Sequence, residues 1–203
     1  MSASAVATYR PRDIMLVLDY SGSMNSNNKI GALKDAVTLF IAALQQAQGE
    51  DRVGFSVYST TGALAEALTF DLKQIKQAVG SRSAGGWTNM GEGMEFGRTE
   101  LQNNRRQRAL SLMVVMTDGM ANRPRNRDPF RYVRDEAALC AAAKIPIVSI
   151  SFTAASAQRI MAEIAQTTGG VHFHVAGSVS QQKKELEEVF RDVAARRPLR
   201  LVD

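Results

Sequence analysis

Two aspartates and three hydroxyl side chains in this sequence are of the types that bind a hard divalent cation. Asp19 is followed at alternate positions by Ser21 and Ser23, while Thr88 and Asp118 lie much further along the chain. Carboxylate and hydroxyl oxygens are the ligands that Mg²⁺ prefers. Two carboxylates would balance the charge of the ion only in part. The cation would therefore keep an open position for an oxygen from outside, most naturally the carboxylate of a partner.

The elements around these residues place them at one edge of a sheet. Residues 12–19 and 109–117 are almost continuous apolar runs, and Asp19 and Asp118 lie at their carboxyl ends. Such runs predict strands buried on both faces of a sheet. Thr88 lies in a glycine-rich loop before a predicted helix. Ligands of open α/β sheets bind beyond the carboxyl ends of the strands, so we expect these polar groups to converge there.

The rest of the chain alternates between the two kinds of periodicity. Further strands are predicted at residues 53–57, 64–68, 145–150 and 171–175, and helices at residues 30–44, 72–79, 90–101, 133–143, 157–166 and 179–195. Apolar strands that alternate with helices predict an α/β fold with a mainly parallel sheet. Residues 53–68 are the exception, because their spacing favours an antiparallel hairpin.

Length and composition fit one folded domain. The chain has 203 residues, of which 45% are hydrophobic, 22% charged and 6% aromatic, which predicts a real core rather than disorder. We expect an extension at residues 1–11, a domain at 12–197 and a tail at 198–203. No apolar run approaches the ~20 residues of a transmembrane helix, although a native anchor could be missing from this chain. Cys140, the one cysteine, lies in a small-residue helical stretch and is expected to be buried.

The charge is concentrated near the candidate site. The formal net charge is +5, and Arg123, Arg125 and Arg127 follow closely after Asp118. These arginines are either a solvated loop or a rim that selects acidic partners, for which the planar guanidinium is well suited. Tyr20 and Trp87, next to the metal motifs, are predicted to belong to the same rim. Nucleic acid is disfavoured as a partner, because no recognition motif accompanies the basic residues.

The five oxygen-bearing residues, in this order and with Asp118 inside Thr117-Asp118-Gly119, resemble the metal-ion-dependent adhesion site of the von Willebrand factor A domain family. The resemblance extends from Asp13 to about Ala195. It implies a three-layer, Rossmann-like fold: a mainly parallel six-stranded sheet with one antiparallel edge strand and helices on both faces.

The same resemblance implies roles for the site residues. Ser21, Ser23 and Thr88 would bind the metal, and Asp19 and Asp118 would bind it directly or through water. Mg²⁺ is the expected cofactor, with Mn²⁺ or Ca²⁺ as alternatives. The expected function is non-enzymatic binding of a protein ligand that presents Asp or Glu. In family members that switch conformation, the counterpart of residues 179–195 moves.

The subfamily is open between two alternatives. Residues 10–13 and 186–198 resemble TadG-like bacterial pilus-assembly proteins, which implies a place at the cell envelope and usually an amino-terminal anchor. An intracellular adaptor of a multiprotein machine, such as a ring ATPase complex, would use the same motif in the cytoplasm. The sequence alone does not separate these alternatives.

Two further chemistries are weighed against this interpretation. A metal-dependent phosphohydrolase could use Asp19 as its nucleophile, but the Ser-Gly-Ser continuation and the lack of an evident lysine partner argue against it. His172 and His174 share one face of a predicted strand and could bind a transition metal. No third ligand accompanies the two histidines. Glu92 and Glu95, which could suggest acid–base carboxylates, are expected instead to stabilise the start of the predicted helix at residues 90–101.

Overall fold

The computed structural model describes residues 10–47, 49–152 and 155–195. The elements are β1 (Arg12–Asp19), the 3₁₀ helix η1 (Gly22–Asn28), α1 (Lys29–Gln46), β2 (Arg52–Tyr58), β3 (Gly62–Thr69), α2 (Leu72–Ser81), α3 (Met90–Asn104), β4 (Leu110–Thr117), α4 (Pro129–Ala142), β5 (Ile147–Phe152), α5 (Ala155–Thr168), β6 (Val171–Val175) and α6 (Val179–Ala194). The predicted tail and residues 1–9 of the predicted extension lie outside the described residues.

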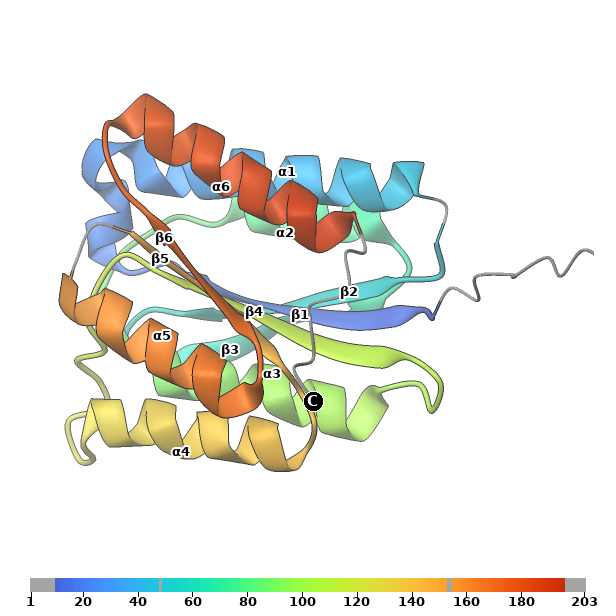
Figure 1. Ribbon diagram of the computed structural model, residues 1–203. Helices are drawn as coiled ribbons and strands as arrows, with labels where there is room; N and C mark the ends of the chain where they lie inside the picture. Colours follow the sequence, from blue (N-terminus) through green and yellow to red (C-terminus); the bar gives the residue numbers. More distant parts are fainter. Residues whose placement is uncertain (1–9, 48, 153–154, 196–203) are drawn as a thin grey trace, which may run out of the picture.

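The strands form one six-stranded sheet in the order β3-β2-β1-β4-β5-β6. All neighbours are parallel except β2 and β3, which form the antiparallel hairpin at one edge. Helices α1, α2 and α6 cover one face of the sheet, and α3, α4 and α5 cover the other (Figure 1). The three-layer α/β fold expected from the sequence is confirmed.

The burial of the central strand β1 on both faces explains why its sequence is apolar without alternation. Ile14, Leu16 and Leu18 point into the core under α1 and α6, while Met15 and Val17 point into the core under α3 and α4. All five side chains are completely buried. A strand covered on both faces needs apolar residues at every position, so its pattern is continuous.

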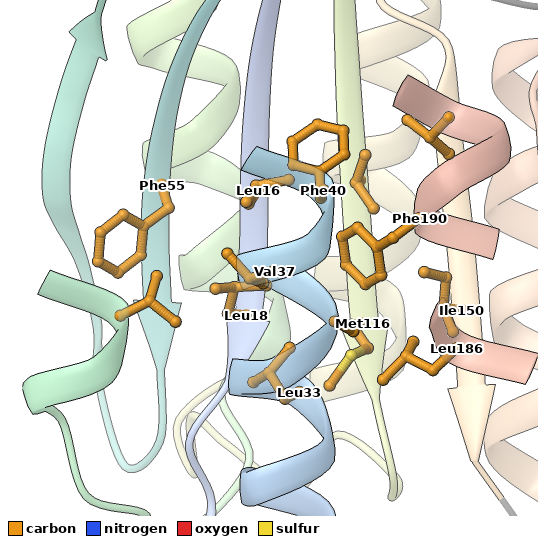
Figure 2. Packing of buried hydrophobic residues seen from close by; sticks show 14 of the residues in the cluster. Leu16, Leu18, Leu33, Val37, Phe40, Phe55, Met116, Ile150, Leu186 and Phe190 are labelled. Atoms are coloured by element: carbon orange, nitrogen blue, oxygen red, sulfur yellow. The ribbon is translucent and has the colours of Figure 1, made fainter. Parts of the chain in front are cut away.

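Helices α1 and α6 close the first core together. Phe40 of α1 and Phe190 of α6 meet edge to face with ring centroids 5.6 Å apart. Figure 2 shows these rings beside Leu16, Met116 and Leu186, which line the same layer. Among the described helices, none has both the length and the apolarity that crossing a bilayer requires.

The real ends of two elements differ from the predicted ones for local reasons. α4 begins at Pro129, earlier than expected, because the Asp128 side chain caps it by accepting from the backbone N–H of Phe130 and Arg131. Proline at the first helical position suits this start. β5 begins only at Ile147, since Pro146 has no N–H to donate to the ladder.

Buried ion pairs hold the end of the sheet away from the candidate site. The Arg12 guanidinium donates to Asp51 Oδ2 at 2.7 Å and to the carbonyl oxygens of Val193 and Ala194 at 2.6 and 3.1 Å. These contacts join the start of β1 to the last turn of α6.

Asp13 is the second anchor at this end. Its completely buried carboxylate accepts from the guanidinium groups of Arg52 and Arg106 and from the backbone N–H of Arg106. Burial alone would raise the pKa of Asp13, but the hydrogen bonds from the two arginines outweigh it and lower the pKa below its ordinary value.

The lowered pKa of Asp13 makes a pH-dependent contribution to stability. The substitution Asp13→Asn should reduce the free energy of unfolding by about 3 kcal/mol at pH 7, because it leaves two guanidinium groups without their charge partner. Since the folded-state pKa lies below the unfolded one, the loss should be full above pH ~4 and shrink as the pH falls further. Urea denaturation at several pH values measures it.

The matched control is Asp35→Asn, which removes an exposed carboxylate paired with Lys183 at 2.7 Å. Exposed pairs contribute little, so this variant should lose less than about 1 kcal/mol. An equal loss in both variants, or a loss in Asp13→Asn that does not change with pH, would contradict this account of Asp13.

Candidate functional site

The candidate site lies where the chain order of the sheet reverses. β1 is followed by β2 on one side, whereas β4 pairs with β1 on the other and continues to β5. Asp19 is the last residue of β1, and Thr117 ends β4 just before Asp118. Parallel pairing of β1 with β4 brings both carboxyl ends to one edge, which is the place where open α/β sheets bind their ligands.

Asp19 is completely buried, and both of its oxygens accept hydrogen bonds. Oδ1 accepts from the backbone N–H of Ser21, and Oδ2 accepts from the Thr117 hydroxyl, each at 2.8 Å. Burial raises the pKa of Asp19 to about 6, and the negative charge of Asp118 adds to this effect. The ionised carboxylate is therefore costly in this position unless a cation is near.

The hydroxyl groups join the two aspartates into one cluster. Ser21 Oγ and Ser23 Oγ are 3.1 Å apart, and Ser23 Oγ donates to Asp118 Oδ1 at 2.6 Å. Four of the five predicted metal ligands are thus connected, although Asp19 and Asp118 are 99 positions apart in the sequence.

Thr88 is held beside the loop that follows β4 by hydrogen bonds of its backbone. Its N–H donates to Asn122 Oδ1 at 2.9 Å, and its carbonyl oxygen accepts from Asn122 N at 3.0 Å, which fixes it against the loop after β4. In the preceding residues, Gly86 accepts from Gly22 N at 3.0 Å. Gly86 has a φ of +81°, and a Cβ there would lie 2.5 Å from the Thr60 hydroxyl, so glycine is required.

Lys29 is a site residue that the sequence analysis missed. Its ammonium donates to Asp118 Oδ2 at 2.8 Å, with side-chain exposures of 10% for Lys29 and 0% for Asp118. The statement that no lysine partner is evident was therefore wrong. η1 turns the chain back after Ser23, so the first residue of α1 faces the site. A lysine at a helix amino terminus is unfavourable because it opposes the helix dipole. Its position in the sequence therefore indicated that a negatively charged group lies nearby.

Only some of the residues predicted to form the ligand-binding rim lie at the surface. Trp87 is 49% exposed, and the guanidinium of the partly exposed Arg123 lies over its ring, 3.9 Å from the centroid. Arg125 is also exposed. Tyr20, in contrast, is buried, and its hydroxyl donates to the carbonyl oxygen of Val79 at 2.8 Å. The prediction that Tyr20 lines the rim was wrong, because its ring is part of the core under α2.

Arg127 turns away from the neighbouring arginines. Its guanidinium lies 3.6 Å from the centroid of Tyr132 and pairs with Asp135 Oδ2 at 3.1 Å. Asp128, the acidic residue next to Arg127 in the sequence, caps α4 instead of pairing with these arginines. Arg123 is therefore the basic group on Trp87, and the exposed Arg125 follows two positions later in the same loop.

The other candidate residues have structural partners. His172 Nδ1 and His174 Nδ1 lie 2.9 and 3.0 Å from the hydroxyls of Ser149 and Ser151, respectively. Among the described residues, no group of three His, Cys, Asp or Glu side chains is placed to hold a metal ion. Cys140 is buried, as expected.

Glu92 accepts from the backbone N–H of Gly62 at 2.7 Å and from the Asn89 amide at 2.6 Å, which ties the start of α3 to the edge hairpin. Glu95 accepts a hydrogen bond from the hydroxyl of Tyr132. Both glutamates therefore connect α3 to its neighbours.

The fold is shared with surface and pilus proteins of known structure. The chain superposes on the PilB minor pilin from Streptococcus sanguinis with a TM-score of 0.69 and 14% identity, covering 94% of this chain and 63% of the pilin. The open conformation of the pilus adhesin SpaC from Lactobacillus rhamnosus GG gives 0.72 and 17%, covering 92% and 30%. A von Willebrand factor type A protein from Catenulispora acidiphila gives 0.71 and 17%, covering 92% and 42%.

Sequence comparison adds relatives that are much longer than this chain. Inter-alpha-trypsin inhibitor heavy chain H3 from Mesocricetus auratus is 30% identical over 127 residues, which are 58% of this chain and 14% of that protein. Calcium-activated chloride channel regulator 3A-1 from Mus musculus is 26% identical over 208 residues, covering 92% and 22%. The chain therefore corresponds to only a small part of each.

The sequence profile of the von Willebrand factor type A domain matches residues 13–191, from the start of β1 to the last turns of α6. This match spans most of the chain, and the sheet order and the helical layers agree with it. The chain belongs to the von Willebrand factor type A domain family.

Proposed function

We propose that this domain binds one divalent cation, preferably Mg²⁺, and that the bound cation binds the carboxylate of a protein partner. The observation that supports this most is the convergence of Asp19, Ser21, Ser23 and Asp118 at the switch point of the sheet. Two buried carboxylates linked by hydroxyl groups form an oxygen-only donor set, which matches the preference of a hard cation.

The electrostatics of the cluster favour a cation. Asp19 and Asp118 repel each other in a buried setting, and burial already raises the pKa of Asp19. A divalent cation would offset this repulsion, while Ser21, Ser23 and Thr88 would supply neutral oxygens. Mn²⁺ and Ca²⁺ accept the same donors. A bound cation would act as a Lewis acid that attracts an external carboxylate.

Catalysis is not part of the proposal. As a phosphoryl-accepting nucleophile Asp19 would need a free, accessible oxygen, but its carboxylate is completely buried and both oxygens accept hydrogen bonds. Ser21 and Ser23 contact each other and Asp118 rather than a general base. The site is better suited to binding a ligand than to catalysing a reaction on it.

A role in adhesion or assembly fits the surroundings of the site. The exposed Trp87 and the partly exposed Arg123 form a platform beside it, with an aromatic face and a guanidinium that suits a carboxylate. Pilus proteins are among the structural neighbours. We therefore extend the proposal to a TadG-like place in pilus assembly at the cell envelope, with an acidic protein segment as ligand.

Cation binding predicts a change in thermal stability. Saturation with Mg²⁺ at 100 times its dissociation constant should add ~2.7 kcal/mol relative to chelator, or roughly 5–10 °C in melting temperature. Thr88→Val removes one hydroxyl at nearly constant volume and should reduce the cation affinity at least about tenfold. Differential scanning fluorimetry with Mg²⁺, Mn²⁺ and Ca²⁺ measures both.

The control for this variant is Thr167→Val, which makes the same change in α5, where the hydroxyl donates to Glu163 O. It should keep the full cation-dependent shift. A wild-type protein that shows no shift with any of the three cations would refute the proposed function. A full shift in Thr88→Val would remove Thr88 from the ligand set.

The basic platform predicts faster association with acidic ligands. The double variant Arg123→Ser/Arg125→Ser should bind a peptide containing one Asp more slowly at low salt, because two guanidinium groups that attract the carboxylate are gone. The difference should shrink near 1 M salt, where charges are screened beyond about 3 Å. Stopped-flow or surface-based kinetics with Mg²⁺ present measure the rates.

A matched control is Arg105→Ser/Arg108→Ser, which removes the same charge just before β4, at the opposite end of that strand. The peptide with Asn in place of Asp is the ligand control. If both double variants slow association equally, net charge rather than the platform steers the ligand.

A further inference from the structure

In the described part of the chain, Lys29 is a charged residue that contacts a candidate metal ligand but cannot itself supply an oxygen to the cation. Its ammonium pairs with Asp118 Oδ2, while Asp118 Oδ1 accepts from Ser23. We propose that Lys29 is a built-in counter-charge of the cation site, which keeps cation binding weak on its own and makes it dependent on the carboxylate of the ligand. This inference rests on the proposed function.

The formal charges carry the argument. Asp19 and Asp118 contribute two negative charges, and Lys29 returns one, so the cluster has a net charge of minus one. A divalent cation brings this to plus one, which a single ligand carboxylate then neutralises. Without Lys29, the formal charge of the site with its cation would be zero instead of plus one. The bound cation would then hold less attraction for an acidic ligand.

The position of Lys29 makes this charge a fixed part of the site. Lys29 is the first residue of α1 and is itself buried, and the next two inward-facing residues, Ala32 and Leu33, pack in the core. Its ammonium therefore stays close to Asp118 in spite of the unfavourable helix dipole. A mobile surface lysine would be screened by solvent, whereas charges in a buried cluster act on each other with a low effective dielectric constant.

Two consequences follow for binding. The cation must enter against the repulsion of Lys29, which weakens its affinity. A carboxylate that joins the cation is attracted both by the residual positive charge of the ion and by Lys29, so cation and carboxylate should bind cooperatively. By reciprocity, each then raises the affinity of the other by the same factor.

The experiment measures Mn²⁺ binding to the whole 203-residue chain by isothermal titration calorimetry, with and without acetate as the carboxylate probe. The variants are Lys29→Met, which removes the charge and the hydrogen bond, and Lys29→Gln, which removes the charge but keeps an N–H donor on a shorter side chain. Both should bind Mn²⁺ alone at least about tenfold more tightly than wild type. Acetate should strengthen Mn²⁺ binding in wild type and do so less in both variants.

Lys34→Met is the matched control on the same helix. Lys34 donates to the carbonyl oxygens of Gly80 and Arg82 and has no role at the site, so this variant should bind Mn²⁺ like wild type. Circular dichroism in chelator and in Mn²⁺ reports folding. A Lys29 variant that folds only with Mn²⁺ would support the proposal, because the cation then replaces the missing charge.

Three outcomes would overturn the proposal. Unchanged or weaker Mn²⁺ affinity in folded Lys29 variants would show that the lysine does not oppose the cation. An undiminished effect of acetate would show that it does not couple the two ligands. Failure of both variants to fold, even with Mn²⁺, would make Lys29 chiefly structural. If wild type itself binds no cation, the proposed function fails first, and this result is distinguishable from the other three.

Discussion

Repulsion between two buried carboxylates is the constraint around which this end of the molecule is organised. Asp19 ends β1 and Asp118 follows β4, so the two carboxylates lie at the same edge of the sheet. Burying these charges costs free energy unless each has hydrogen-bond or ion-pair partners. The Thr117 hydroxyl and the Ser21 N–H accommodate the first, while Ser23 and the ammonium of Lys29 accommodate the second. These four contacts offset the repulsion between the two carboxylates.

The sheet supplies the precision that such a cluster requires. β1 is paired with β2 from Asp13 to Asp19 and with β4 from Arg12 to Leu18, and it is covered by helices on both faces. Its last residue therefore has little freedom to move. The loops around it are tied together by short backbone hydrogen bonds, such as Gly22 N to Gly86 O. Rigid strands and crosslinked loops hold the oxygens in place before any ligand arrives.

The fold and the convergence of Asp19, Ser21, Ser23 and Asp118 could be predicted because they depend on local patterns. Continuous apolar runs marked β1 and β4, and polar residues at their ends marked the site. Lys29 was not predictable in this way, since its contact with Asp118 depends on how η1 turns the chain. Tyr20 was misplaced because an aromatic residue in a polar turn can face either way, and a carbonyl oxygen under α2 satisfies its hydroxyl.

The contact of Arg12 with the last turn of α6 has a topological consequence. Because the guanidinium of Arg12, the first residue of β1, donates to the carbonyl oxygens of Val193 and Ala194, the polypeptide enters and leaves the folded unit at adjacent points. These points lie at the opposite end of β1 from Asp19. A domain whose entry and exit points are adjacent can be inserted into a loop of a larger protein without separating the two ends of that loop. The oxygen cluster would then face away from the point of insertion.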